Sequence, residues 1–215
     1  IDLNTYESIS ILSNIFTNNE RSIALKGVKE NAFGDAAFML SYNTFQNDDI
    51  FLEQNDYELS TALYLSNIQG DISVNDNDIQ NSHFSIFGKV GFGSGGVINN
   101  NLFSTTFNED SLGYSGLATL VLGTMNGIQI HNNEFDNVMK GMHITSSTEN
   151  FKVMNNVFSA AVASSVGFEK TAIKLTTLDN SEFISNQMIG FDTAIRIDDT
   201  NNVMSSNLEF NGNTF

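Results

Sequence analysis

Residues 128–135 read Ile-Gln-Ile-His-Asn-Asn-Glu-Phe, and this stretch decides the fold. Ile128 and Ile130 alternate with polar residues, which is typical of a strand with one buried face. Asn133 follows, and Phe135 lies two residues beyond it. The same order returns on average about every 28 residues, a length typical of one coil of a solenoid. The repeated asparagines are Asn14, Asn43, Asn77, Asn101, Asn133, Asn156, Asn186 and Asn213.

A second short apolar strand follows each asparagine, for example Leu63-Tyr64-Leu65 or Ile173-Lys174-Leu175. The connections that lead to it alternate between 7 residues and 15–18 residues. Such short strands cannot bury an apolar face alone, but stacked about 4.8 Å apart they form parallel sheets around one core. We expect the asparagine amides to point inward and to bond to the amides above and below. The phenylalanines two residues further on should stack in the same way.

The Ile-x-Ile-x-x-Asn-x-Phe coil resembles the right-handed parallel β-helix repeat of the pectin-lyase-like superfamily, over about residues 9–215. The resemblance implies an all-β fold, a right-handed single-stranded parallel β-helix (solenoid) of about eight coils. Residues 1–215 then form a single domain, which we expect to be a segment of a longer protein. In the family's enzymes, the sheet formed by the strand after the variable connection usually carries the substrate groove on its outward face. The superfamily includes lyases, hydrolases, epimerases, tailspikes and adhesins, so the resemblance alone does not select a function.

Composition narrows the possible partners. Nine Lys+Arg against 25 Asp+Glu give a formal net charge of −16. This charge argues against a general nucleic-acid binder and against an electrostatic membrane partner, since both need a positive face. The chain has no apolar run of about 18 residues, so we expect no membrane insertion by this segment. Because it has no cysteine, disulfides and thiol nucleophiles are excluded.

One outward position of the strand after the connection predicts a ridge along the molecule. In chain order it holds Ala24, Tyr64, Phe87, Val121, His143, Lys174 and Arg196. The preceding outward position, two residues earlier in each strand, holds small residues throughout, Gly141 and Ala172 among them, which predicts a shallow furrow beside the ridge. An acidic or neutral glycan fits there, with Tyr64 or Phe87 under a sugar ring and Lys174 and Arg196 on carboxylates or sulfates. Alternatively, the long connections cover this face and the small residues make room for them.

Four residues of the ridge are the candidates for catalysis: His143, Lys174, Arg196 and Asp198. Gly141-Met142-His143 and Arg196-Ile197-Asp198 are similar to motifs of polygalacturonase-like members. The paired aspartates expected on the preceding coil are missing, so a hydrolase with two flanking carboxylates is disfavoured. A lyase needs a base and a neutraliser of a uronate carboxylate, and Arg196 or Lys174 with Asp198 has the chemistry for these roles.

The remaining motifs concern metal binding and exposed aromatic residues. Acidic turns such as Asp48-Asp49 and Asp198-Asp199 have the oxygens for calcium, but none matches a calcium motif. We therefore expect no cofactor and no metal site. The long connections, about residues 46–61, 104–118 and 159–171, add Tyr57 and Tyr114 as exposed-aromatic candidates for ligand binding.

Taken together, these features predict a non-catalytic extracellular or cell-surface β-helix. Its expected role is adhesion or carbohydrate recognition, through its side loops and the outward face of one sheet. The expected partner is a glycan or the surface of a host or neighbouring cell. Two alternatives stay open: a polysaccharide lyase-type enzyme, and a self-stacking structural filament subunit that associates end to end or laterally.

Overall fold

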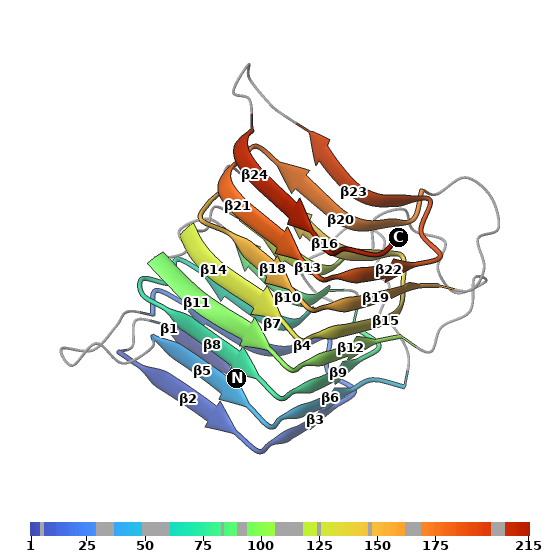
Figure 1. Ribbon diagram of the computed structural model, residues 1–215. Helices are drawn as coiled ribbons and strands as arrows, with labels where there is room; N and C mark the ends of the chain where they lie inside the picture. The colour runs from blue at the N-terminus through green and yellow to red at the C-terminus, as the bar shows by residue number, and fades with distance from the viewer. Residues whose placement is uncertain are drawn as a thin grey trace.

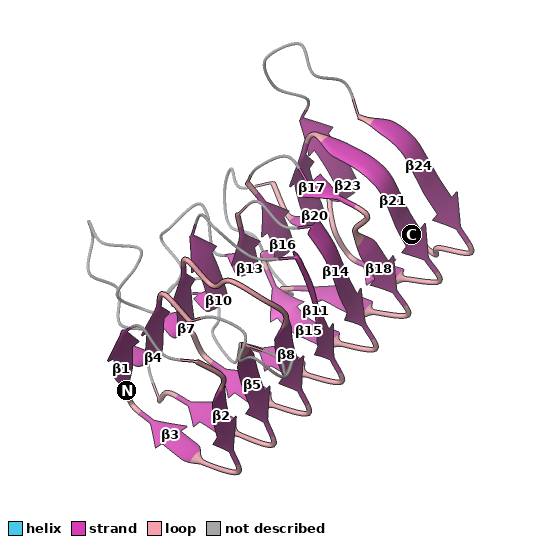
Figure 2. Ribbon diagram, turned by 90° about the vertical axis from the view of Figure 1, so that its left-hand side faces the viewer, coloured by secondary structure: helices cyan, strands magenta, loops and turns pink. Residues whose placement is uncertain are grey.

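In the described part of the chain, the strands pair in parallel and belong to three sheets (Figures 1 and 2). The computed structural model contains no helix among the residues it describes. Those residues are 1–4, 7–28, 37–48, 61–82, 84–89, 94–105, 118–123, 126–145, 148–161, 169–198 and 205–215. This arrangement is consistent with a parallel β-solenoid, in which each repeat adds one strand to each sheet.

The eight-stranded sheet is formed by the strands that follow the variable connections. Its order is β1 (Asp2–Asn4), β4 (Arg21–Lys26), β7 (Thr61–Ser66), β10 (Phe84–Lys89), β13 (Ala118–Leu122), β16 (Lys140–Ile144), β20 (Thr171–Thr176) and β23 (Thr193–Asp198).

The nine-stranded sheet is formed by the strands that precede the repeated asparagines. It contains β2 (Ile9–Leu12), β5 (Phe38–Ser41), β8 (Ile72–Asn75), β11 (Ser94–Asn99), β14 (Asn126–His131), β17 (Thr148–Glu149), β18 (Lys152–Met154), β21 (Leu178–Ile184) and β24 (Ser206–Asn211). Both β17 and β18 pair with β14 and β21, so they are two parts of one interrupted strand.

The seven-stranded sheet was not predicted, and its strands begin directly after the asparagines. They are β3 (Ile15–Thr17), β6 (Thr44–Gln46), β9 (Asp78–Gln80), β12 (Leu102–Ser104), β15 (Glu134–Val138), β19 (Val157–Ala160) and β22 (Gln187–Ile189). For the seven asparagines from Asn14 to Asn186, the large apolar residue two positions later is the second residue of its strand. The expected stacking is confirmed for Phe16–Phe45, Phe103–Phe135 and Phe135–Phe158, with ring centroids 4.7, 4.9 and 4.4 Å apart.

The repeated asparagines form a continuous ladder at the turn between the nine- and seven-stranded sheets. From Asn14 to Asn186, the backbone N–H and the side-chain Nδ2 of each asparagine donate to Oδ1 of the next one, at 2.9–3.1 Å. The six asparagines between the two ends are buried. Since buried amides need partners, the ladder supplies at each turn the polar contacts that the core cannot.

The residue before each ladder asparagine adopts a left-handed backbone conformation. Its φ lies between 54° and 64° in all eight repeats, and the residues are Ser13, Tyr42, Asp76, Asn100, Asn132, Asn155, Ser185 and Gly212. Asn, Asp and Gly tolerate this region best, which accounts for the Asn-Asn pairs of the sequence. This turn redirects the chain from one sheet into the next.

One apolar core lies between the three sheets and runs along the molecule from Ile11 to Met188. The inward positions of the alternating strands build it, Ile128, Ile130 and Phe135 of the motif above among them, each at most 1% exposed. Burial of this apolar surface, at about 25 cal/mol per Å², is the main favourable contribution to the free energy of folding. The outward positions of the same strands are thereby left for polar residues.

Candidate functional site

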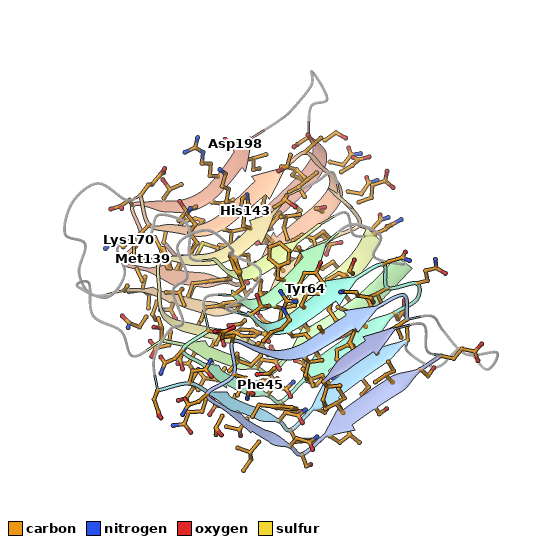
Figure 3. The ribbon with its side chains drawn as sticks, turned by 180° about the vertical axis from the view of Figure 1, so that it is seen from behind. Phe45, Tyr64, Met139, His143, Lys170 and Asp198 are labelled. Atoms are coloured by element: carbon orange, nitrogen blue, oxygen red, sulfur yellow. The ribbon has the colours of Figure 1, made fainter. Side chains whose placement is uncertain are left out.

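The residues of the predicted ridge lie at matching register positions on the eight-stranded sheet. Neighbouring strands pair Ala24 with Tyr64, Tyr64 with Phe87, Phe87 with Val121, Val121 with His143, His143 with Lys174, and Lys174 with Arg196. In the view from behind, Tyr64, His143 and Asp198 follow one another along this sheet (Figure 3). The register therefore places aromatic groups on the earlier strands and basic groups on the last three.

The prediction of a furrow beside the ridge is wrong. Ala62 and Ala172 belong to the apolar core rather than to the outer face. A Cβ atom added at Gly141 would lie 2.5 Å from Cδ1 of Phe158 and 2.7 Å from the backbone oxygen of Ala172. These residues are small because the core is tight at this corner, and not because a ligand lies against them.

The aromatic half of the ridge is packed against itself. The rings of Tyr64 and Phe87 are stacked with centroids 5.9 Å apart, and Phe84 contacts Phe87 at 5.2 Å. The guanidinium carbon of Arg21 lies 4.9 Å from the centre of the Tyr64 ring. Tyr64 is only 6% exposed, so it offers no open ring face for a sugar, whereas Phe87 is partly exposed. Tyr57 and Tyr114 lie outside the described residues.

The basic half of the ridge contains an ion-pair network around Arg196. Its Nε donates to Oδ1 of Asp198 at 2.9 Å, and its Nη1 donates to Oε2 of Glu169 at 3.0 Å. Lys174 Nζ lies 3.4 Å from Oδ2 of Asp198. The hydroxyl of Thr193 donates to the second oxygen of Glu169. Both carboxylates of this cluster are therefore held by Arg196.

The ion-pair network shifts the pKa values of Asp198 and Arg196. The hydrogen bond from Arg196 is the largest cause of the lowered pKa of Asp198. Desolvation opposes it, and the charge of Arg196 together with the hydrogen bond and charge of Lys174 lowers the pKa further. The hydrogen bond from Arg196 to Asp198 also raises the pKa of Arg196. Asp198 is therefore ionised at neutral pH, and its charge is directed at Arg196 and Lys174 rather than at a substrate.

His143 and Lys140 lie on β16, at the edge of this network. Partial burial lowers the pKa of His143 to about 4, with further lowering by the charges of Lys174 and Lys140. Partial burial, followed by the charge of Lys174, also lowers the pKa of Lys140. His143 is therefore a neutral imidazole at neutral pH, between two ammonium groups. Lys140 and Glu169 were not among the sequence candidates.

Charge is partitioned between the sheets. The strands of the eight-stranded sheet hold six of the nine Lys and Arg residues and only two acidic residues, Asp2 and Asp198. The strands of the other two sheets hold one basic residue, Lys152, and seven acidic residues. A protein with a net charge of −16 thus concentrates its positive charge on one sheet.

Among the residues that the structure describes, no group of three or more His, Asp or Glu side chains is placed to hold a metal ion. Among the same residues, none forms a helix that could cross a membrane.

Comparison of the chain with family models, with curated proteins and with solved structures finds no match. What the fold and the site define is an all-β protein of parallel strands with a basic cluster on one sheet.

Proposed function

We propose that the chain is a non-catalytic extracellular or cell-surface protein that binds carbohydrate through the outer face of the eight-stranded sheet. In this proposal the three parallel sheets form a right-handed β-helix of about eight coils, related to the pectin-lyase-like superfamily. The parallel pairing, the asparagine ladder and the stacked phenylalanines support that architecture. The surface it presents to a partner is then one side of a stiff rod.

The observation that carries the proposal is the partition of charge. Six of nine basic residues lie on one sheet of a strongly acidic chain, and four ionisable groups of that sheet meet at His143, Lys174, Arg196 and Asp198. Concentrated cations on adjacent strands, about 4.8 Å apart, present a row of donors to an extended ligand. A polysaccharide is such a ligand, because its groups recur along a chain. Adhesion would follow if the glycan belongs to a neighbouring cell surface.

Glycan-array binding by the 215-residue chain tests this function. We expect binding to a subset of glycans without release of products. The charge reversal Lys174→Glu should abolish binding, whereas Lys152→Glu should leave it unchanged. Lys152 is a suitable control because it lies on the nine-stranded sheet, also paired with an acid, at 2.8 Å from Glu182. An array with no bound glycan, or equal loss in both variants, would refute the proposal.

One observation favours a second candidate, a polysaccharide lyase. A neutral imidazole at His143 is in the form that accepts a proton, and it is paired with Lys174, whose ammonium can neutralise a uronate carboxylate. His143 would remove the proton α to the carboxylate, and the electron pair would form the C=C bond as the glycosidic oxygen leaves. Incubation with polygalacturonate should then produce ultraviolet absorption of unsaturated uronate, which His143→Gln abolishes. Absence of that absorption in the unmodified chain eliminates the lyase.

A further inference from the structure

The cations of the basic cluster differ in whether the protein already neutralises them. Arg196 contacts two carboxylates, Glu169 and Asp198, at 3.0 and 2.9 Å. Lys174 shares Asp198 with Arg196 at the longer distance of 3.4 Å. Lys140 forms no ion pair with any described residue, and His143 likewise has no hydrogen-bond partner among them. Both carboxylates therefore form their closest contacts with Arg196, although the charge of Glu169 also acts on Lys140 and that of Asp198 on His143. Lys140 and Lys174 are less fully neutralised than Arg196.

Lys140, Lys174 and the neutral imidazole of His143 lie together. His143 pairs directly with Lys174 across β16 and β20, so their Cα atoms are about 4.8 Å apart. Lys140 begins the same strand as His143, and the intervening Gly141 and Met142 are buried. Lys140 and Lys174 are each only partly exposed, which weakens the screening of their charges by water, and the neutral imidazole of His143 is likewise partly exposed. The three groups also act on one another, because the charges of Lys140 and Lys174 both lower the pKa of His143.

We propose that Lys140, His143 and Lys174, rather than Arg196, determine ligand specificity, and that they do so by binding the anionic groups of a polyanionic glycan. This inference rests on the glycan-binding function proposed above. An anion at this position relieves the repulsion between the two ammonium groups and accepts hydrogen bonds from them. The role of Arg196 is then structural, because it holds Glu169 and Asp198 against the sheet. Lys174 keeps only its longer contact with Asp198, and both lysines can reach a ligand.

The chemistry of the anion can be carboxylate or sulfate, and both attract ammonium donors through charge-assisted hydrogen bonds. Three polymers separate the cases: polygalacturonate carries carboxylates, dextran sulfate carries sulfates, and unmodified dextran is neutral. Titration calorimetry of the 215-residue chain should show binding to at least one charged polymer and at least about tenfold weaker binding to dextran. The preferred charged polymer identifies the anion.

Matched variants then assign the contacts. Lys140→Gln and Lys174→Gln should each weaken binding of the preferred polymer by about three- to tenfold, whereas Lys140→Arg should retain it. The control Lys152→Gln on the nine-stranded sheet should change the affinity by less than about twofold. Circular dichroism of each variant checks that the fold is intact.

Two results overturn the inference while leaving the proposed function in place. The first is equal affinity for dextran and for both charged polymers, which would make recognition independent of charge. The second is unchanged affinity in both Lys140→Gln and Lys174→Gln, which would mean that these lysines do not contact the ligand. If no polymer and no glycan of the array binds the unmodified chain, the proposed function fails and this inference fails with it.

Discussion

Replacing Asn133 by alanine should remove more stability than almost any other single substitution in the chain. Its side chain donates to the backbone oxygens of Ile98 and His131 at 2.9 and 3.1 Å, and to Oδ1 of Asn156 at 3.0 Å. Its Oδ1 accepts from the backbone and side-chain nitrogens of Asn101 at 2.9 and 3.0 Å. Because the two hydrogens of Nδ2 are shared among three acceptors, the side chain makes about four full hydrogen bonds. At about 1 kcal/mol net for each, the loss is about 4 kcal/mol. Because Asn133 is 2% exposed, water cannot replace these partners.

Asn14 provides a matched control in the same ladder. It is exposed, and its side chain donates only to the backbone oxygen of Leu12 and to Oδ1 of Asn43. Asn14→Ala should therefore cost about 1 kcal/mol. Urea unfolding followed by far-ultraviolet circular dichroism measures both free energies, provided that the m-values agree, since repeat proteins can unfold in parts. If the free energies of unfolding of the two variants differ by less than about 1 kcal/mol, the buried ladder does not stabilise the fold as argued.

Two further predictions use the same unfolding assay. Gly141→Ala should destabilise the protein by about 1–3 kcal/mol, because the new methyl group overlaps the Phe158 ring and the Ala172 backbone; unchanged stability would mean that the position faces open space. The stability should also fall as the pH is lowered from 6.5 to about 4, because the pKa of His143 is near 4 in the folded chain and 6.5 in the unfolded one. The unfolded state then binds the extra proton, and with partial solvent screening the loss is about 1–2 kcal/mol. His143→Gln should flatten the pH dependence in this window, and an unchanged slope in that variant would contradict the assignment.

The repeat could be found in the sequence because each of its signals has one physical cause. Ile128 and Ile130 alternate because one face of a strand is buried, and Asn133 recurs because its amide supplies two donor hydrogens and a carbonyl acceptor at a buried turn. The seven-stranded sheet was missed because its strands show too little alternation. Thr44–Gln46, for example, has one apolar residue between two polar ones, which a period-2 pattern cannot distinguish from a turn.

One break in the alternation explains two errors at the site. Strict alternation from the outward His143 predicts that Gly141 faces outward and that Lys140 lies on the same side as the inward Met142. In the structure both Gly141 and Met142 are buried, and Ala62 and Leu63 are likewise two consecutive core residues. Two consecutive inward positions shift every earlier residue of the strand to the opposite face. Lys140 thereby joins His143, and the furrow disappears.

The other features of the site depend on contacts between distant residues. Glu169 lies 27 residues before Arg196, in the segment that leads into β20, and no local pattern relates the two. Likewise, the pairing of Tyr64 with Phe87 follows from the register, but the burial of Tyr64 depends on what covers it. A sequence pattern assigns a residue to a face, whereas exposure and ion pairing depend on the elements that pack there.

Net charge is the feature most easily misinterpreted in this chain. A formal charge of −16 argues against polyanions as partners when the charge is treated as spread over the whole molecule. The sheets separate the charges, however, so that a ligand at Lys140 and Lys174 meets nearby cations first. At physiological ionic strength the Debye length is about 8 Å, less than the thickness of two packed sheets, which are about 10 Å apart. Exposed acidic residues of the other sheets that lie more than this length away through the solvent are therefore largely screened from this ligand. It follows that lowering the salt concentration strengthens attraction and repulsion together, and that the local face, not the net charge, decides which one prevails.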